Sequence, residues 1–187
     1  LVASYRRHNK ELPAWLRSIA ESDKSLADFS KRLAVFIALS QRLTAWNPFG
    51  PILQQIAAIN TSFLGMMKSW QDRFDAMVED YTREYKAELM PLAQKSLELR
   101  KNLTQAEKVS ILRAVEMEAK LRATRRAFKE IRADIEKQLA LWEKFIPPGL
   151  EETGVVRTFR ELQQRVRLWL QGLEMDLIRL EADVEQA

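Results

Sequence analysis

Apolar residues recur every three or four positions along most of the chain, which is the pattern of amphipathic α-helices. The longest such stripe occupies residues 51–103, and a helix of this extent would be roughly 80 Å long at about 1.5 Å per residue. A chain of 187 residues cannot enclose a helix of that length in a compact domain. The pattern therefore predicts an elongated bundle.

Three breaks divide the apolar pattern into four segments. Two prolines and a glycine interrupt it at residues 47–51, a capping-box sequence lies at Thr104–Glu107, and two prolines and a glycine at 147–149 end the third stripe. Pro91 lies inside the second stripe and predicts a kink near Ala87–Met90. The expected helices span about 12–46, 51–103, 105–145 and 153–185.

Short breaks between long helices favour antiparallel neighbours. The expected fold class is therefore all-α, an elongated antiparallel bundle of three to four long, kinked amphipathic helices. Residues 12–187 form one elongated helical domain in this interpretation, and the polar residues 1–11 lead into it or end a linker. Because the sequence starts at Leu1 rather than methionine, we expect it to be part of a longer chain.

The side chains that most often carry chemistry are scarce. The chain has no cysteine, which excludes disulfides and thiolate sites, and its single histidine, His8, lies in the polar leading segment. A di-iron site in a helical bundle needs histidines that are missing here, and no glycine-rich phosphate loop is present. We therefore expect no enzymatic activity, no metal site and no cofactor.

Basic residues gather in the third predicted helix, between residues 120 and 132, although the net charge of the chain is only +4. One interpretation is a solvated face that is balanced by neighbouring carboxylates such as Glu130 and Asp134. A second interpretation is a binding site for an anionic membrane surface, and a third is a binding site for nucleic acid. Nucleic acid is not expected, because Phe128 is the sole aromatic residue within the cluster that could stack on a base.

Three stretches resemble the BAR-domain superfamily, most closely the sorting-nexin type. They are Leu26-Ala-Asp-Phe-Ser-Lys-Arg-Leu33, Tyr85-Lys-Ala-Glu-Leu-Met-Pro-Leu92 and the basic helix that runs into Trp142-Glu-Lys-Phe-Ile-Pro147. The resemblance implies a crescent-shaped antiparallel homodimer or heterodimer. It also implies binding to membranes that are rich in phosphoinositide or phosphatidylserine, and a role in sensing or shaping curvature during trafficking.

The resemblance also assigns residues to these contacts. The tip of the crescent would carry Arg100, Lys101 and Lys108, and its membrane-facing side would carry Lys120, Arg122, Arg125, Arg126 and Lys129. We expect the apolar partner interface to include Phe29, Leu33, Phe36, Trp70, Trp142 and Trp169. The expected location is cytoplasmic and peripheral to a membrane, with the endosome as the compartment that the resemblance implies.

A second hypothesis remains open, in which the chain is a helical scaffold or adaptor that acts only through contacts with proteins. The stretch Phe159–Leu170 is similar to the first helix of a spectrin repeat, although no repeat of about 100 residues is present. This hypothesis predicts no lipid binding and an apolar groove that accepts a partner helix.

Overall fold

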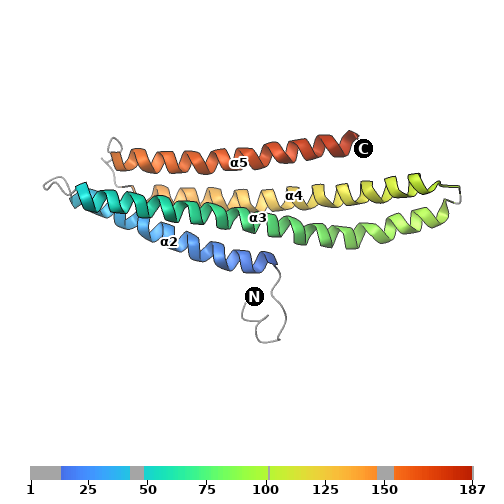
Figure 1. Cartoon of the computed structure of the whole chain (residues 1–187), viewed down its shortest axis with the longest axis horizontal. Coiled ribbons are helices and arrows are strands. Elements are labelled where there is room, and N and C mark those ends of the chain that lie inside the picture. Colours follow the sequence, from blue (N-terminus) through green and yellow to red (C-terminus); the bar gives the residue numbers. More distant parts are fainter. Residues whose placement is uncertain (1–13, 43–48, 101, 147–153, 187) are drawn as a thin grey trace, which may run out of the picture.

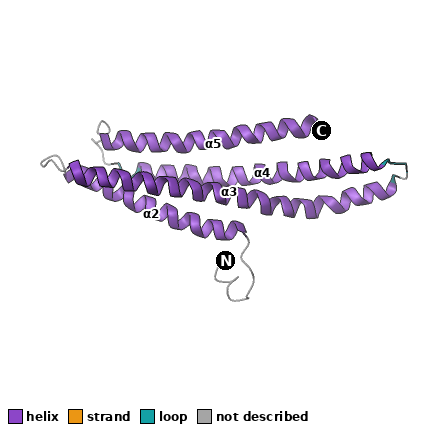
Figure 2. Ribbon diagram, viewed as in Figure 1, coloured by secondary structure: helices purple, strands orange, loops and turns teal. Residues whose placement is uncertain are grey.

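The computed structural model describes residues 14–42, 49–100, 102–146 and 154–186. All regular structure in these ranges is α-helical, and successive helices run antiparallel in a bundle (Figures 1 and 2). The predicted fold class is therefore confirmed. The helices are α2 (Ala14–Arg42), α3 (Phe49–Leu99), α4 (Gln105–Glu143) and α5 (Gly154–Gln186).

Helix α3 is the longest element, with 51 residues. At about 1.5 Å per residue it is roughly 75 Å long, as the apolar stripe predicted. It stays helical through Pro91, although proline removes one backbone hydrogen bond. In Figure 1 the helix bends along its length, so the proline is accommodated within a curved helix and does not end it.

The helix ends follow local backbone chemistry. Helix α3 begins at Phe49, so Pro51 occupies its first turn, where the missing N–H costs no hydrogen bond. The predicted start at Pro51 was thus two residues late, and Asn47 and Pro48 of the predicted break lie outside the described residues. At the start of α4, the Thr104 hydroxyl accepts a hydrogen bond from the Glu107 backbone N–H at 3.2 Å, which confirms the predicted N-cap.

The core lies where all four helices run side by side, and we call this part the body. Aromatic rings from all four of these helices meet at its centre. Trp142 packs edge-on against Phe29 with ring centroids 4.9 Å apart, and Trp70 stacks on Trp142 at 6.2 Å and on Trp169 at 6.3 Å. Phe29, Trp70 and Trp142 are each at most 2% exposed.

Beyond the body, α3 and α4 continue as a pair without α2 or α5 (Figure 1). Two contacts show how far α2 and α5 extend along this pair. Ser25, near the middle of α2, is hydrogen-bonded to Ser69 of α3, and Glu181, near the end of α5, forms an ion pair with Arg125 of α4. We call the uncovered pair, residues 86–99 and 105–118, the arm.

Candidate functional site

The predicted basic face lies on α4, and ion pairs neutralise most of it. The Arg122 guanidinium lies 3.0 Å from Glu118 on the same helix. Arg125 reaches Glu181 of α5 at 3.0 Å. Arg126 pairs with two glutamates, Glu84 and Glu130. Three of the five predicted face residues therefore have carboxylate partners. The pairs of Arg125 and Arg126 connect α4 to α5 and α3, whereas the pair of Arg122 lies within α4.

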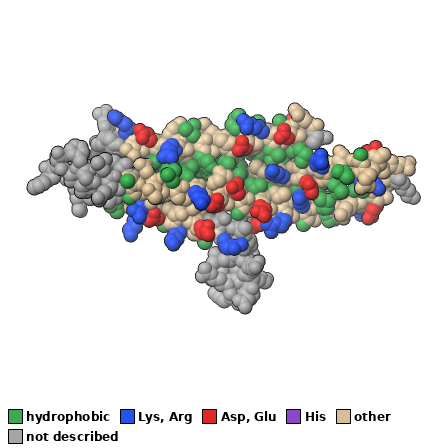
Figure 3. Space-filling model, in the orientation of Figure 1, with side chains coloured by type: hydrophobic (Ala, Val, Ile, Leu, Met, Phe, Trp, Pro, Cys, Tyr) green, Lys and Arg blue, Asp and Glu red, His purple; other side chains and the backbone are tan. Residues whose placement is uncertain are grey.

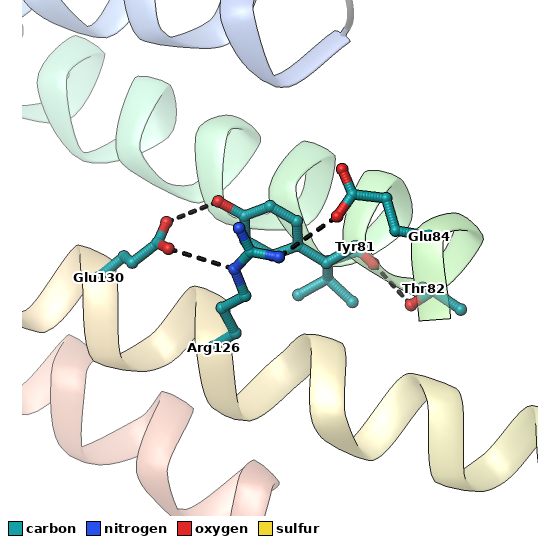
Figure 4. A network of polar contacts seen from close by, with 6 residues as sticks. Tyr81, Thr82, Glu84, Arg126 and Glu130 are labelled. Atoms are coloured by element: carbon teal, nitrogen blue, oxygen red, sulfur yellow. Dashed lines mark hydrogen bonds and ion pairs between the residues drawn. The ribbon is translucent and has the colours of Figure 1, made fainter. Parts of the chain in front are cut away.

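Arg126 is the centre of a polar network between α3 and α4 (Figure 4). Its guanidinium lies 3.2 Å from Glu84 and 3.4 Å from Glu130, and its central carbon lies 3.9 Å from the centroid of the Tyr81 ring. The Tyr81 hydroxyl donates a hydrogen bond to Glu130 at 2.6 Å. We call Tyr81, Glu84, Arg126 and Glu130 the clasp, which lies where the body gives way to the arm.

The clasp changes the acidity of its tyrosine. Burial of the phenol, together with its hydrogen bond to the Glu130 carboxylate, raises the pKa of Tyr81 to about 12. A neutral tyrosine that donates to a carboxylate is held in one orientation across the helix pair. The network therefore fixes the register of α3 against α4.

The remaining face residues, Lys120 and Lys129, are exposed and form no ion pair with any carboxylate in the described part of the chain. Lys129 also belongs to a longer row. Lys137 and Lys144 follow at spacings of eight and seven residues, which places all three on one side of α4. All three are exposed, and we call them the lysine row.

The predicted tip residues lie at the far end of the arm. Arg100 is exposed directly after α3, Lys108 is partly exposed in the first turn of α4, and Lys101 lies outside the described residues. Lys108 and Lys129 are 21 residues apart on one helix, which corresponds to about 30 Å. The structure thus separates the predicted tip from the predicted face.

Five of the residues predicted for a partner interface contribute to the core of the single chain. Phe29, Leu33, Phe36, Trp70 and Trp142 are all at most 4% exposed. Packing within one chain explains their burial, and a contact between them and a second chain stays a prediction.

Trp169, the sixth predicted interface residue, is partly buried. Its ring nitrogen donates a hydrogen bond to the Gln71 side chain at 2.8 Å, so it too is engaged within the bundle.

A second polar junction joins the end of α4 to the start of α5. Arg160 forms two hydrogen bonds with the Glu143 carboxylate, at 2.5 and 2.6 Å, and Gln163 donates to the same carboxylate at 3.0 Å. These hydrogen bonds, with Arg160 the largest contributor, lower the pKa of Glu143. This junction could not be predicted from the sequence, because nothing in the pattern of residues links Glu143 to Arg160.

Two grooves border α5. The one between α5 and α4 has a volume of about 720 Å³ and a mixed lining in which Arg132, Arg167, Glu136 and Glu174 face the space above Phe128. The other lies between α5 and α3, where Figure 3 shows hydrophobic side chains at the surface. It measures about 380 Å³ and is lined in part by Phe74, Val78, Leu173 and Leu180.

The described residues offer no arrangement for metal chemistry. No group of three or more histidine, cysteine, aspartate or glutamate side chains among them could hold a metal ion. His8 lies outside the described residues. That the chain is not an enzyme stays a prediction.

No helix in the described ranges is long and apolar enough to cross a membrane.

The arm leaves apolar side chains in contact with solvent. Ala93 is its only buried residue within the described positions of 86–118. Leu92 is 64% exposed, Leu99 77% and Val109 47%. These residues belong to the same apolar stripes that are covered in the body.

The fold of the described residues defines a class of protein, an all-α bundle in which four long helices run antiparallel. Comparison with models of known families, with curated proteins and with solved structures gave no significant match.

Proposed function

We propose that this chain is a non-enzymatic helical scaffold that binds other proteins through its arm. The observation that carries the proposal is the continuation of the apolar stripe of α3 beyond the cover of α2 and α5. Leu92 and Leu99, seven residues apart on one side of α3, remain more than 60% exposed there.

Burial of this stripe would supply binding energy. Covering an exposed leucine side chain contributes up to about 1.5–3 kcal/mol, so two leucines and Val109 would support a helix-in-groove contact. Such contacts use apolar anchors at helical spacing, which is the spacing of Leu92 and Leu99. The balanced charge of the arm also fits a protein partner better than a polyanion.

The ion pairs of α4 favour a protein partner over a lipid surface. Arg122, Arg125 and Arg126 each have a carboxylate within 3.2 Å, and each pair lowers the positive potential that would attract an anionic membrane. Two of these pairs, those of Arg125 and Arg126, connect α4 to other helices, whereas a lipid-binding face needs free cations.

A photo-crosslinking experiment tests the arm. A photoreactive amino acid at Leu92 in the full chain is expected to capture one or a few discrete proteins in cells, with the adducts confirmed by mass spectrometry. Gln94 is the matched control, because it is also exposed and lies on the opposite side of α3, two residues on. Equal capture at both positions, or none at Leu92, would refute the proposal.

A second candidate function follows the BAR-like resemblance and is supported by the lysine row. In this proposal, the chain forms a curved dimer that binds anionic, phosphoinositide- or phosphatidylserine-rich membranes at the cytoplasmic side of endosomes. Lys129, Lys137 and Lys144 carry no ion pair with a described carboxylate. A cation near an anionic lipid surface contributes about 1 kcal/mol, so two copies of the row would support reversible attachment.

Vesicle co-sedimentation separates the two candidates. If the membrane proposal holds, vesicles of phosphatidylcholine and phosphatidylserine should pellet the protein at low salt, and vesicles of phosphatidylcholine alone should not. Replacing Lys129, Lys137 and Lys144 with glutamate should abolish this. Lys24→Glu with Lys31→Glu, on the exposed side of α2, is the matched control. Charge reversal at Arg125 and Arg126 is less suitable, because both residues hold helices together.

A further inference from the structure

Helix α5 carries a second seam on the side that faces away from the bundle. Its inner side is buried through residues such as Phe159, Val166 and Leu173. On the outer side, Leu168 is 54% exposed, Met175 52% and Ile178 50%. The outer seam continues with alternating steps of four and three residues, the spacing of a coiled coil. Its members are Gln164, Leu168, Gln171, Met175, Ile178 and Ala182, and Gln171 also borders the groove between α5 and α4.

Gly172 lies beside this seam, in the middle of the helix. Glycine destabilises a helix interior relative to alanine, so its presence calls for a reason. No packing within the chain supplies one, because a Cβ atom built at Gly172 would meet nothing within 4 Å. A glycine on an outer helix face lets a second backbone approach closely at that point.

The charges along α5 indicate what approaches. Before Gly172 the helix has four arginines and one glutamate, and after it five carboxylates and one arginine. Arg160 and Glu181 form ion pairs with other helices, and Arg179 pairs with Asp176 within α5. Without these four residues, three arginines and one glutamate remain before Gly172, and three carboxylates remain after it. An antiparallel copy of α5 would place the basic half of each helix against the acidic half of the other. A parallel copy would place like charges together.

We propose that the outer seam of α5 binds the same seam of a second copy of this chain, antiparallel, with the two-fold axis near Gly172. This surface is distinct from the arm, so the inference goes beyond the scaffold function and does not depend on it. The arrangement directs the two arms to opposite ends. The dimer would be about 100 Å long, against about 75 Å for one chain, from the helix rise and the position of Gly172 along the bundle.

Light scattering on the purified chain across concentrations gives the first test. We expect a dimer for the natural sequence and at least a tenfold higher dissociation constant for Leu168→Glu with Met175→Glu. Leu64→Glu is the matched control, because Leu64 is 57% exposed on α3, and it should leave the dimer intact. A monomeric natural sequence at about 100 μM, a concentration well above a typical micromolar dissociation constant, would overturn the proposal. So would a dimer that survives the double substitution.

The glycine gives a second test that adds no charge. Gly172→Leu is expected to weaken the dimer at least tenfold, since the added side chain keeps the helices apart, while the circular dichroism of the monomer stays unchanged. Gly65→Leu is its control, because Gly65 in α3 has equally open surroundings. An equal effect at both glycines, or none at Gly172, would contradict close approach at this point.

Orientation is tested with introduced cysteines, which the absence of natural cysteines makes selective. Gln171→Cys lies near the proposed two-fold axis and should form a disulfide with its own copy under mild oxidation. Two Gln164→Cys residues would be about 24 Å apart in an antiparallel pair, well beyond disulfide reach. Efficient self-crosslinking at position 164 would show a parallel pair and overturn the proposal. Capture of another protein by Leu92 would not affect this result.

Discussion

Helices α3 and α4 run through both the body and the arm, but their packing differs between the two parts. In the body, α2 and α5 flank α3 and α4, and side chains such as Phe63 and Ile131 are at most 1% exposed. In the arm, α3 and α4 have only each other, and Ala93 is the single buried residue among the described positions of 86–118. Both parts are fully helical, so the arm depends on local helix-forming terms where the body depends on burial.

The largest expected effect is in the body. Trp142→Ala should lower the free energy of unfolding by about 3–5 kcal/mol, because it removes a buried ring that contacts Phe29 and Trp70 and leaves a cavity. Urea denaturation followed by circular dichroism measures the change. Leu99→Ala in the arm, where the side chain is 77% exposed, is the control and should change stability by less than about 0.5 kcal/mol. Equal losses would show that the two parts do not differ as described.

The clasp between body and arm should give a smaller effect. Tyr81→Phe removes a hydrogen bond to a carboxylate and should cost about 1.5–3 kcal/mol at neutral pH. Because folding raises the pKa of Tyr81 to about 12, the stabilisation is complete below pH 10 and is lost as the pH rises toward 12. The difference between the natural chain and the variant should therefore vanish over that range in denaturation at alkaline pH. A constant difference would exclude this role of the hydroxyl.

Within the arm, the largest loss of stability is expected from a substitution at Thr104, the N-cap of α4. Thr104→Ala removes the oxygen that accepts from the Glu107 backbone and should cost about 1 kcal/mol. Hydrogen–deuterium exchange should show faster exchange in residues 105–118, with the body unchanged. Thr104→Ser keeps the acceptor and should exchange like the natural chain. Faster exchange throughout the bundle would instead show that arm and body unfold as one unit.

The smallest expected effect is at the junction of α4 and α5. Glu143→Gln weakens the contact with Arg160, but both side chains are 47% exposed, so the cost should stay below about 1 kcal/mol. The pKa of Glu143 is lowered in the folded chain, so its contribution is present above its ordinary value of 4.5 and lost as the pH falls below it. The melting temperatures of the natural chain and of Glu143→Gln should therefore converge as the pH falls from neutral to acidic. Divergence at low pH would contradict this sign.

Much of the fold could be predicted from the sequence, because its determinants are local. The three-to-four spacing gives the helices, and Thr104 with Glu107 gives the turn before α4. Phe49 was missed as the start of α3, because the pattern Asn-Pro-Phe-Gly-Pro hides the fact that proline suits a first turn.

The surfaces were harder to predict, because their determinants are distant in sequence. The basic cluster of α4 was expected as an exposed face, yet Arg125 pairs with a residue 56 positions away and Arg126 with one 42 positions away. Nothing in the spacing of the arginines reveals these partners. The aromatic residues were ambiguous for a related reason, since the same stripe results from packing within a chain or between two chains.

The stack of Trp142, Trp70 and Trp169 also makes the body visible to spectroscopy. Its three indoles come from α4, α3 and α5, and no tryptophan lies between residues 71 and 141, which include the whole arm. Emission and near-ultraviolet dichroism from the stack would therefore register whether α5 is seated on the other two helices. Melting of the arm would leave both signals almost unchanged, so the protein contains an optical probe for one of its two parts and none for the other.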